Sequence, residues 1–271
     1  MTEFLAPLAE QLAAVPGVSA VALGGSRARG THRPDSDYDL GLYYRRPLDV
    51  DALRGLAAAV ADEPAEVTAP GAWGPWVDGG AWLTVGGRRV DWIYRDLDRV
   101  ERIWQECRQG RYEIGFQPGH PLGFYSHVYA GETARARVLS DPTGALRSLS
   151  EQTRVYPPAL RDALVAGLWE ADFAVRIAGY GASGTDPVYA AGCLFRAAGV
   201  LCHALHAHTG EWLLNEKAMV AATGRLACAP AGFAERLNAL LGAVGTDREA
   251  IAAAVAAMGE LTAEVRAAVG A

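Results

Sequence analysis

Val21-Ala-Leu-Gly-Gly-Ser-Arg-Ala-Arg-Gly-Thr-His-Arg-Pro-Asp-Ser-Asp-Tyr-Asp-Leu-Gly-Leu42 is the stretch that decides the fold, because it joins an apolar run, a small-residue turn and two carboxylates. The apolar run over residues 18–23 predicts a short buried strand. Gly24-Gly25-Ser26 then ends the strand with residues that let a phosphate group approach the backbone closely. The hydroxyl of Ser26 adds one more hydrogen-bonding group at this turn.

A second strand is expected from Asp37 to Tyr44. Strand side chains alternate between two faces, so Asp37 and Asp39 share one face while apolar side chains occupy the other. Two carboxylates on one face repel each other, and a divalent cation relieves this repulsion. Mg²⁺ commonly combines one or two carboxylates with substrate phosphates. The stretch therefore predicts a site where the turn holds the β and γ phosphates of a nucleotide and the aspartates hold the metal.

The pattern resembles the signature of the DNA polymerase β-type nucleotidyltransferase superfamily, which reads Gly-Ser, a variable spacer and then Asp-x-Asp or Asp-x-Glu between apolar residues. Gly25-Ser26 and Asp37-Tyr38-Asp39 match its two halves. The run Ser26-Arg-Ala-Arg-Gly30 looks most like two bacterial groups, the small-molecule nucleotidyltransferases of the aminoglycoside-resistance type and the minimal nucleotidyltransferases of toxin–antitoxin pairs. The resemblance covers the N-terminal part of the chain, up to about residue 100.

Other interpretations of the same stretch fit less well. Asp35-Ser-Asp-Tyr-Asp39 begins like a calcium-binding loop, but that pattern requires Gly at Leu40 and Glu at Arg46. No Gly-Lys-Ser/Thr follows the glycines, which excludes a Walker phosphate loop. The remaining alternative is a solvated, glycine-rich hairpin with ordinary surface aspartates.

A third carboxylate, Asp91, lies inside the otherwise apolar run 88–94. A charge in such a run needs a reason, because burying it without a partner is costly. In the superfamily a third carboxylate arrives on a later strand beside the first pair, which implies that Asp91 takes a proton from the attacking hydroxyl or completes a metal shell. The alternative is an edge-strand aspartate paired with Arg89 or Arg95.

The composition is that of a globular protein, with 271 residues, 51% hydrophobic and 21% charged. A net charge of −6 and a pI near 5.5 argue against a dominant nucleic-acid-binding face. We expect no membrane span, because charges interrupt the alanine-rich segments. The four cysteines lack metal-binding spacing and the N-terminus lacks the features of a signal peptide, so we expect a cytoplasmic protein.

The expected organisation is an α/β (α+β) nucleotidyltransferase domain with a small mixed sheet over residues 1–112, followed by a helical bundle domain over 113–271. Two strands, 81–85 and 88–94, form a hairpin across Gly86-Gly87. For Trp73 and Trp76, in the Pro/Gly-rich loop between residues 70 and 80, packing onto the domain is favoured over stacking on a base. Apolar spacing predicts helices over residues 3–14, 49–61, 96–109, 157–178, 187–208 and 250–269, with a shorter one starting at 215.

Several features of the second half have two interpretations each. The segment 119–132 is dense in polar-ligand side chains, and is either part of the ligand site or a helix start with a buried aromatic face. Gly179-Tyr-Gly-Ala-Ser-Gly184 follows a helix and is interpreted as an interhelical loop. His203 and His206 are interpreted as core or surface histidines, not as a zinc site. In the segment 119–132, the side chains that could bind a polar ligand are His120, Tyr125, His127, Tyr129 and Glu132.

Three further features of the second half remain, and two of them are assigned only conditionally. Lys217, the single lysine, is either a surface residue or, as the superfamily would allow, a ligand of the triphosphate. Thr246 and Glu249 match a capping box for the last helix. Glu170 and Asp172 are solvated helix positions, unless the acceptor is a polyamine-like antibiotic whose ammonium groups they would bind.

The resemblance implies Mg²⁺-dependent transfer of a nucleoside monophosphate, AMP from ATP, to a hydroxyl of a small molecule such as an aminoglycoside-like antibiotic, with release of pyrophosphate. Asp37 and Asp39 would bind the metal, and Gly25 and Ser26 would hold the outer phosphates. Either Arg27 or Arg29 would offset the charge that develops on these phosphates. The alternatives are transfer to a protein or tRNA, and a non-catalytic nucleotide-binding relative. The sequence leaves the acceptor, the biological role and the oligomeric state open.

Overall fold

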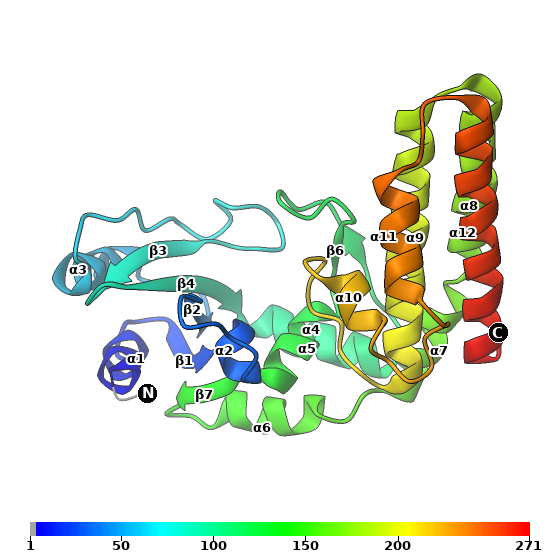
Figure 1. The fold of residues 1–271 in the computed structure, drawn as a ribbon. Coiled ribbons are helices and arrows are strands. Elements are labelled where there is room, and N and C mark those ends of the chain that lie inside the picture. Colours follow the sequence, from blue (N-terminus) through cyan, green and yellow to red (C-terminus); the bar gives the residue numbers. More distant parts are fainter. Residues whose placement is uncertain (1–3) are drawn as a thin grey trace. The chain divides into compact units, whose positions relative to one another are not determined.

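The computed structural model describes residues 4–271. The chain forms two compact units, one made of the residues up to Glu106 together with Tyr112–Val155, the other of Cys107–Arg111 together with Tyr156–Ala271. The first unit combines a mixed sheet with helices and the second is helical, so the mixed α/β class with a C-terminal helical region is confirmed. Figure 1 shows the elements of both units in chain order.

The first unit is built on a five-stranded sheet in the order β3-β4-β2-β1-β7. Strands β2 and β4 are parallel, and the other neighbouring pairs are antiparallel. The expected hairpin is β3 and β4, joined across Gly86 and Gly87. A separate two-stranded sheet joins β5 to β6. The elements of this unit are α1 (Leu5–Ala13), β1 (Val18–Leu23), α2 (Gly25–Arg29), β2 (Tyr38–Tyr44), α3 (Val50–Val60), β3 (Gly80–Val85), β4 (Arg88–Asp96), α4 (Leu97–Arg108, which ends in the second unit), β5 (Ile114–Gly115), β6 (Phe124–Tyr125), α5 (Val128–Arg135), β7 (Arg137–Ser140) and α6 (Ala145–Thr153).

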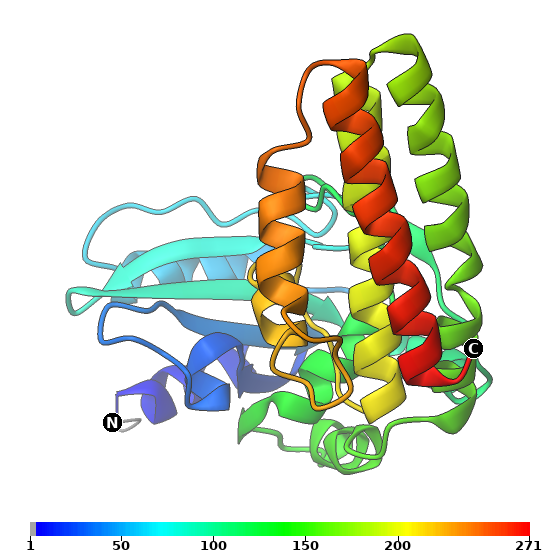
Figure 2. The same ribbon diagram turned by 45° about the vertical axis from the view of Figure 1, so that its right-hand side comes forward.

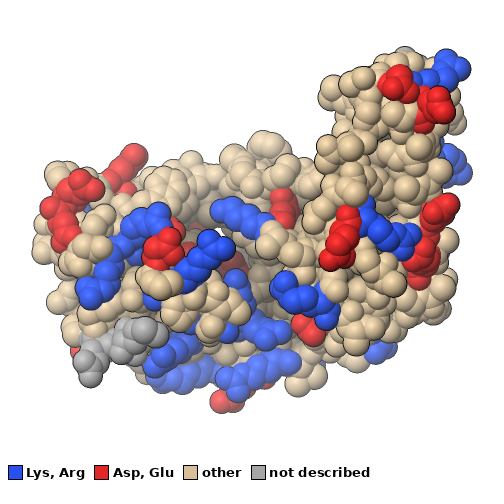
Figure 3. All heavy atoms as spheres, viewed as in Figure 1, with Lys and Arg blue, Asp and Glu red and all other residues tan. Residues whose placement is uncertain are grey.

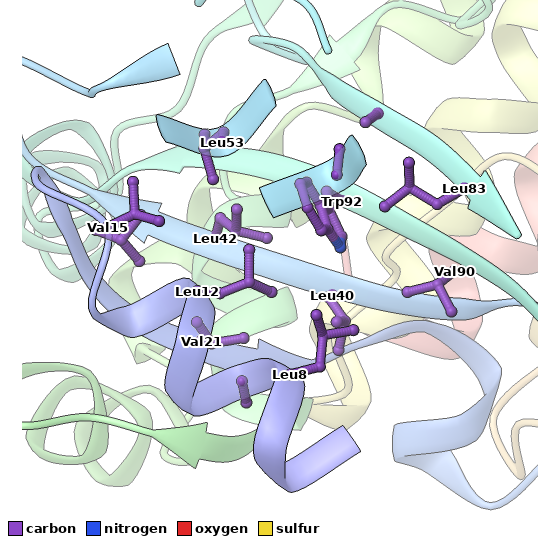
Figure 4. Close-up of a cluster of buried hydrophobic side chains, with 14 of the residues drawn as sticks. Leu8, Leu12, Val15, Val21, Leu40, Leu42, Leu53, Leu83, Val90 and Trp92 are labelled. Atoms are coloured by element: carbon purple, nitrogen blue, oxygen red, sulfur yellow. The ribbon is translucent and has the colours of Figure 1, made fainter. Parts of the chain in front are cut away.

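One face of the five-stranded sheet is buried under α1 and α3. Leu40 and Leu42 of β2 are fully buried, as is Trp92 of β4, and they pack with Leu12 of α1 and Leu53 of α3 (Figure 4). Because strand side chains alternate, the residues between these buried positions point to the opposite face. The hydrophobic core of the first unit therefore fixes which face of the sheet carries the acidic residues.

The two loop tryptophans pack onto the first unit, as expected. The ring of Trp73 stacks on Trp82 with centroids 4.4 Å apart, and Trp76 stacks on Phe124 at 5.5 Å. The peptide N–H groups of Trp76 and Val77 both donate to the side-chain oxygen of Gln117 at 2.9 Å. The loop is held by these contacts.

The second unit is a bundle around α9, the longest of its helices in the described chain (Figure 2). By length and composition α9 is the one described helix that could cross a membrane, but 61% of its apolar window is buried inside the protein. It contacts α7, α8 and α12, as the core helix of a bundle does. His203 and His206, at 6% and 5% exposure, lie in this core, as the sequence indicates. The bundle helices are α7 (Pro158–Ala166), α8 (Trp169–Gly184), α9 (Pro187–Thr209), α10 (Met219–Thr223), α11 (Phe233–Gly242) and α12 (Arg248–Val269).

The structure corrects four details of the second half. The helix expected over 157–178 is divided into α7 and α8. The division lies at Gly167, because glycine has a weak helix propensity. Residues 179–184 are the last turns of α8 and not a loop, because Gly181 allows α8 to approach Ala190 of α9 closely. Asp247, not Thr246, caps α12 by accepting from the Ala250 N–H at 2.9 Å. The short helix expected from residue 215 begins instead at 219, as α10.

Residues 112–155 lie in the first unit, whereas the expected domain limit placed residues 113–155 with the helical domain. The physical reason is strand β7, which pairs with β1 and extends the sheet. Helix α6 also contacts β1. The functional limits of 1–112 and 113–271 stay a prediction, but the packing of the first unit continues to Val155.

Candidate functional site

The glycine turn lies directly against Asp39. The N–H of Gly24 donates to the backbone oxygen of Asp39 at 2.7 Å, which ties the turn to β2. Gly25 has φ +60°, and a Cβ at this position would overlap the Asp39 carboxylate. Ser26 follows in the short helix α2. The turn expected from the sequence is thus present, and only glycine fits its second position.

The three predicted carboxylates come together on two neighbouring strands. Asp39 on β2 and Asp91 on β4 are direct register partners across the parallel pair. Asp37 immediately precedes β2, so it approaches the same face. Both Asp39 and Asp91 are only partly exposed, in contrast to the fully buried residues beside them.

Burial and nearby negative charge raise the pKa values of Asp39 and Asp91. The pKa of Asp91 rises to about 6, through burial first and then through the charges of Asp39 and Asp37. The pKa of Asp39 is also raised, by burial, Asp37 and Glu132, while Arg29 and Arg95 act in the opposite direction. The site concentrates negative charge that the nearby cations only partly offset.

The edge-strand alternative for Asp91 does not agree with the structure. Strand β4 lies between β3 and β2, so Asp91 is not on a sheet edge. Arg89 instead contacts Asp37, with Nε 2.5 Å from the carboxylate, and donates to the Asp35 carbonyl at 2.9 Å. Arg95 is bound by both carboxylate oxygens of Glu132, at 2.7 and 2.9 Å. Within residues 4–271, Asp91 has no ion pair.

The two candidate phosphate-binding arginines have different surroundings. The guanidinium of Arg27 donates to the carbonyls of Pro34, Ser36 and Asp37 and lies 3.8 Å from the centroid of the Tyr38 ring. These contacts hold the loop that leads into β2. Arg29 is exposed and its charge acts on Asp39. The geometry therefore favours Arg29 over Arg27 for contact with a ligand.

The carboxylates of Asp37, Asp39 and Asp91 are suitable ligands for Mg²⁺, but their oxygens do not converge on one metal position. In the part of the chain that the structure describes, no three acidic, His or Cys side chains are grouped closely enough to hold a metal by themselves. The carboxylate of Asp37 forms an ion pair with Arg89. Carboxylate oxygens are nonetheless the ligands that Mg²⁺ prefers, and substrate phosphates usually complete its shell. Asp39 and Asp91 would form the core of such a site, with Asp37 beside them.

The segment 119–132 contributes one residue to the surroundings of the site. Tyr125 and His127 are 3% and 1% exposed and pack their rings against each other and Tyr112. His120 lies edge-on to the Phe124 ring. For these residues the structure agrees with the buried aromatic face. Glu132 differs, because it binds Arg95 and raises the pKa of Asp39.

The sequence did not single out Arg95 as a member of the site. Its side chain is 8% exposed and joins the acidic face to Glu132. The signal lay in its position, four residues after Asp91 on the same strand, which places both side chains on one face. The distant Glu132 had no such local signal.

Of the candidate residues in the second unit, Glu170 and Asp172 form ion pairs with arginines of the same unit. The role of Lys217 stays a prediction. Glu170 binds Arg196 with both carboxylate oxygens, at 2.6 and 3.0 Å, and Asp172 binds Arg266 at 2.5 Å. These carboxylates are therefore not isolated acceptors for ammonium groups. The backbone N–H of Lys217 donates to the side chain of Asn215 at 2.7 Å. A contact of Lys217 with a triphosphate stays a prediction, since Lys217 belongs to the other unit.

Comparison with known proteins gives one family. Residues 7–78 match the family model described as Nucleotidyltransferase domain, a range that holds the glycine turn, Asp37 and Asp39. A solved structure of a nucleotidyltransferase-like protein from Exiguobacterium sibiricum 255-15 is similar, with 13% sequence identity, a TM-score of 0.48 and coverage of 99% of this chain and 76% of that one. No curated protein matches the chain. Residues 7–78, which hold the glycine turn and the first two aspartates, are therefore similar to a nucleotidyltransferase domain.

Proposed function

We propose that this protein transfers a nucleoside monophosphate, AMP from ATP, to a hydroxyl group of a small molecule and releases pyrophosphate. The observation that carries the proposal is the register pairing of Asp39 with Asp91 beside a turn in which only glycine fits. The family match over residues 7–78 supports nucleotidyl transfer in general. Mg²⁺, ATP and the small-molecule acceptor are part of the proposal.

Each element of the site has a part in binding the nucleotide. Backbone N–H groups at Gly25 and Ser26, with the Ser26 hydroxyl, would bind the β and γ phosphates. Arg29 would offset the negative charge that develops on the leaving pyrophosphate. Asp39 and Asp91, with Asp37, would hold Mg²⁺, which when bound neutralises phosphate charge and orients the triphosphate.

Asp91 is the proposed general base. The oxygen of the acceptor hydroxyl forms a bond to the α-phosphorus, and the bond from that phosphorus to the oxygen bridging to the β-phosphate breaks. Pyrophosphate leaves with the bonding electrons, and Asp91 accepts the hydroxyl proton. With no metal bound, the pKa of Asp91 is raised to about 6, so this carboxylate is more basic than an ordinary aspartate.

The proposal is tested by measuring pyrophosphate release from each of the four nucleoside triphosphates with Mg²⁺. Each assay is run with and without a pooled panel of aminoglycosides and lincosamides. We expect release with ATP that depends on the acceptor pool. Absence of release with every nucleotide and pool, in a preparation that binds nucleotide by calorimetry, would contradict transfer to these antibiotic classes and favour a macromolecular acceptor or a biosynthetic acceptor outside the panel.

A further inference from the structure

A second charged feature of the first unit lies outside the carboxylate site. A cavity of about 620 Å³ is bounded by the end of α2, the last turn of α5, strand β7 and helix α6. Five arginines line it, and Glu151 is its only acidic lining residue among those described. Figure 3 shows basic side chains gathered over this part of the first unit. The arginines of this cavity are Arg29, Arg135, Arg137, Arg147 and Arg154.

The fold brings these arginines together from four separate segments. Pairing of β7 with β1 places Arg137 opposite Leu23, just before the turn that leads into α2. Arg135 ends α5, directly before β7. On α6, residues three or four apart lie on the same face. Glu151 therefore follows Arg147 on this face, and Arg154 follows one turn later. The cluster is therefore a product of the tertiary structure, and no single stretch of sequence shows it.

Most of the positive charge of the cavity comes from arginines without an ion-pair partner among the described residues. Within residues 4–271, neither Arg29, Arg135, Arg147 nor Arg154 forms an ion pair, although the whole chain carries a net charge of −6. The buried carboxylate of Asp141 is already used, because it accepts from the backbone N–H of Arg147 at 2.9 Å. Like charges around a concave surface focus a positive potential there. A bound anion would relieve this repulsion.

We propose that the arginine cavity binds an anion with several phosphate groups, either a nucleoside polyphosphate or inorganic polyphosphate. Guanidinium groups bind phosphate oxygens in a bidentate manner. Several guanidinium groups around one cavity can therefore bind successive phosphate groups of one chain. The volume lies in the range of small-molecule sites. Ala28, Ala134 and Ala136 leave room between the arginine side chains.

The shape and the charge of the protein favour a small anion over nucleic acid. Nucleic-acid-binding faces extend basic residues along a stripe and usually belong to basic domains. Here the arginines surround one cavity in an acidic chain. Binding at this cavity does not depend on nucleotidyl transfer, because only Arg29 is shared with the proposed transfer site.

The experiment measures calorimetric binding of tripolyphosphate to the full chain in EDTA, where metal-dependent binding at the carboxylates is suppressed. The test variant Arg135→Gln/Arg154→Gln removes two charges from the cavity. The control Arg111→Gln/Arg225→Gln removes two exposed charges of the second unit, and neither arginine forms an ion pair within residues 4–271. We expect the Kd to rise about 10-fold or more in the test variant, since each lost charged hydrogen bond weakens binding severalfold, and to stay within about 2-fold in the control.

Further measurements distinguish the possible ligands. ATP binding more tightly than tripolyphosphate in EDTA supports a nucleoside polyphosphate, and equal affinity supports inorganic polyphosphate. Equal Kd values for wild type and the test variant, with unchanged circular dichroism, would overturn the proposal. So would a single-stranded oligonucleotide that displaces tripolyphosphate at a lower concentration than ATP does. Asp39→Asn is expected to keep tripolyphosphate binding, so the cavity and the transfer site can fail independently.

Discussion

Asp39 on β2 and Asp91 on β4 are direct register partners on adjacent parallel strands, so two segments far apart in sequence place their carboxylates side by side. Burial raises the pKa values of both carboxyl groups, the charge of Asp37 raises both further, and the charge of Asp39 adds to the rise at Asp91. A fold that tolerates this repulsion gains from a bound cation.

Asp91→Asn is predicted to stabilise the metal-free protein at neutral pH. The folded-state pKa of Asp91 is about 6 against an ordinary value of 3.8, so ionisation is harder in the folded state. Stability therefore falls as pH rises from about 4 to about 6, and Asn removes this loss. Allowing for partial exposure, we expect a gain on the order of 1 kcal/mol at pH 7.5. Urea unfolding in EDTA at pH 7.5 and 4.5 checks it, and an equal gain at both pH values would refute the charge explanation.

Gly25→Ala is predicted to abolish transfer, whereas Gly30→Ala is not. Both glycines have positive φ, +60° and +71°, so either substitution costs about 1 kcal/mol of backbone strain. Only at position 25 does the added methyl overlap the Asp39 carboxylate, and a Cβ at Gly30 meets nothing within 4 Å. Thermal unfolding and pyrophosphate release of both variants separate strain from displacement of Asp39. Full turnover in Gly25→Ala would mean that the turn and Asp39 do not act together.

Arg27→Ala and Arg29→Ala are predicted to differ in what they impair. Arg27 holds the loop before β2 through three carbonyls and the Tyr38 ring, so its loss should lower stability by about 1–3 kcal/mol. Arg29 has no such contacts, and its loss should leave unfolding unchanged while slowing turnover. Chemical unfolding curves and steady-state rates of both variants test the distinction. A stable, inactive Arg27→Ala would assign the phosphate role to Arg27 instead.

Arg95→Ala is predicted to be severely destabilising. Arg95 is nearly buried and binds Glu132 with two hydrogen bonds, so removing it leaves an acidic side chain without its cation. Loss of one partner from a buried pair costs about 3–5 kcal/mol. The control is Arg102→Ala, which breaks the exposed pair with Glu106 in α4 and should cost about 0.5 kcal/mol or less. Similar losses in the two variants would show that Arg95 is not structurally critical.

The sequence predicted local features well where one stretch carried the whole signal. The glycine turn and the alternation from Asp37 to Tyr44 are confirmed, because strand period and turn chemistry are local properties. The caps of α3 and α9 by Asp49 and Asp186 are local features of the same kind. The register of Asp91 against Asp39 needed the superfamily resemblance, since no local pattern predicts which strands pair.

What the sequence missed depends on contacts between distant segments. Arg27 or Arg29 was expected to offset charge on the phosphates, and no spacing rule indicated that loop carbonyls up to ten residues away engage Arg27. A phosphate-binding role of Arg27 stays a prediction. The glycine-rich end of α8 stays helical because α9 packs against Gly181, and tertiary packing overrides propensity there. The Arg95–Glu132 pair and the arginine cavity likewise join segments that no spacing rule connects.

The most direct test of the central claim compares pyrophosphate release by the wild-type protein and by Asp39→Asn, with ATP, Mg²⁺ and the acceptor pool. Wild type should release pyrophosphate only when Mg²⁺ and acceptor are both present. Asp39→Asn should keep the wild-type circular dichroism spectrum and lose release by about 10³-fold, because it removes a charge aimed at the metal and phosphates. Undiminished release in a correctly folded Asp39→Asn would contradict a transfer site built on the Asp39–Asp91 pair.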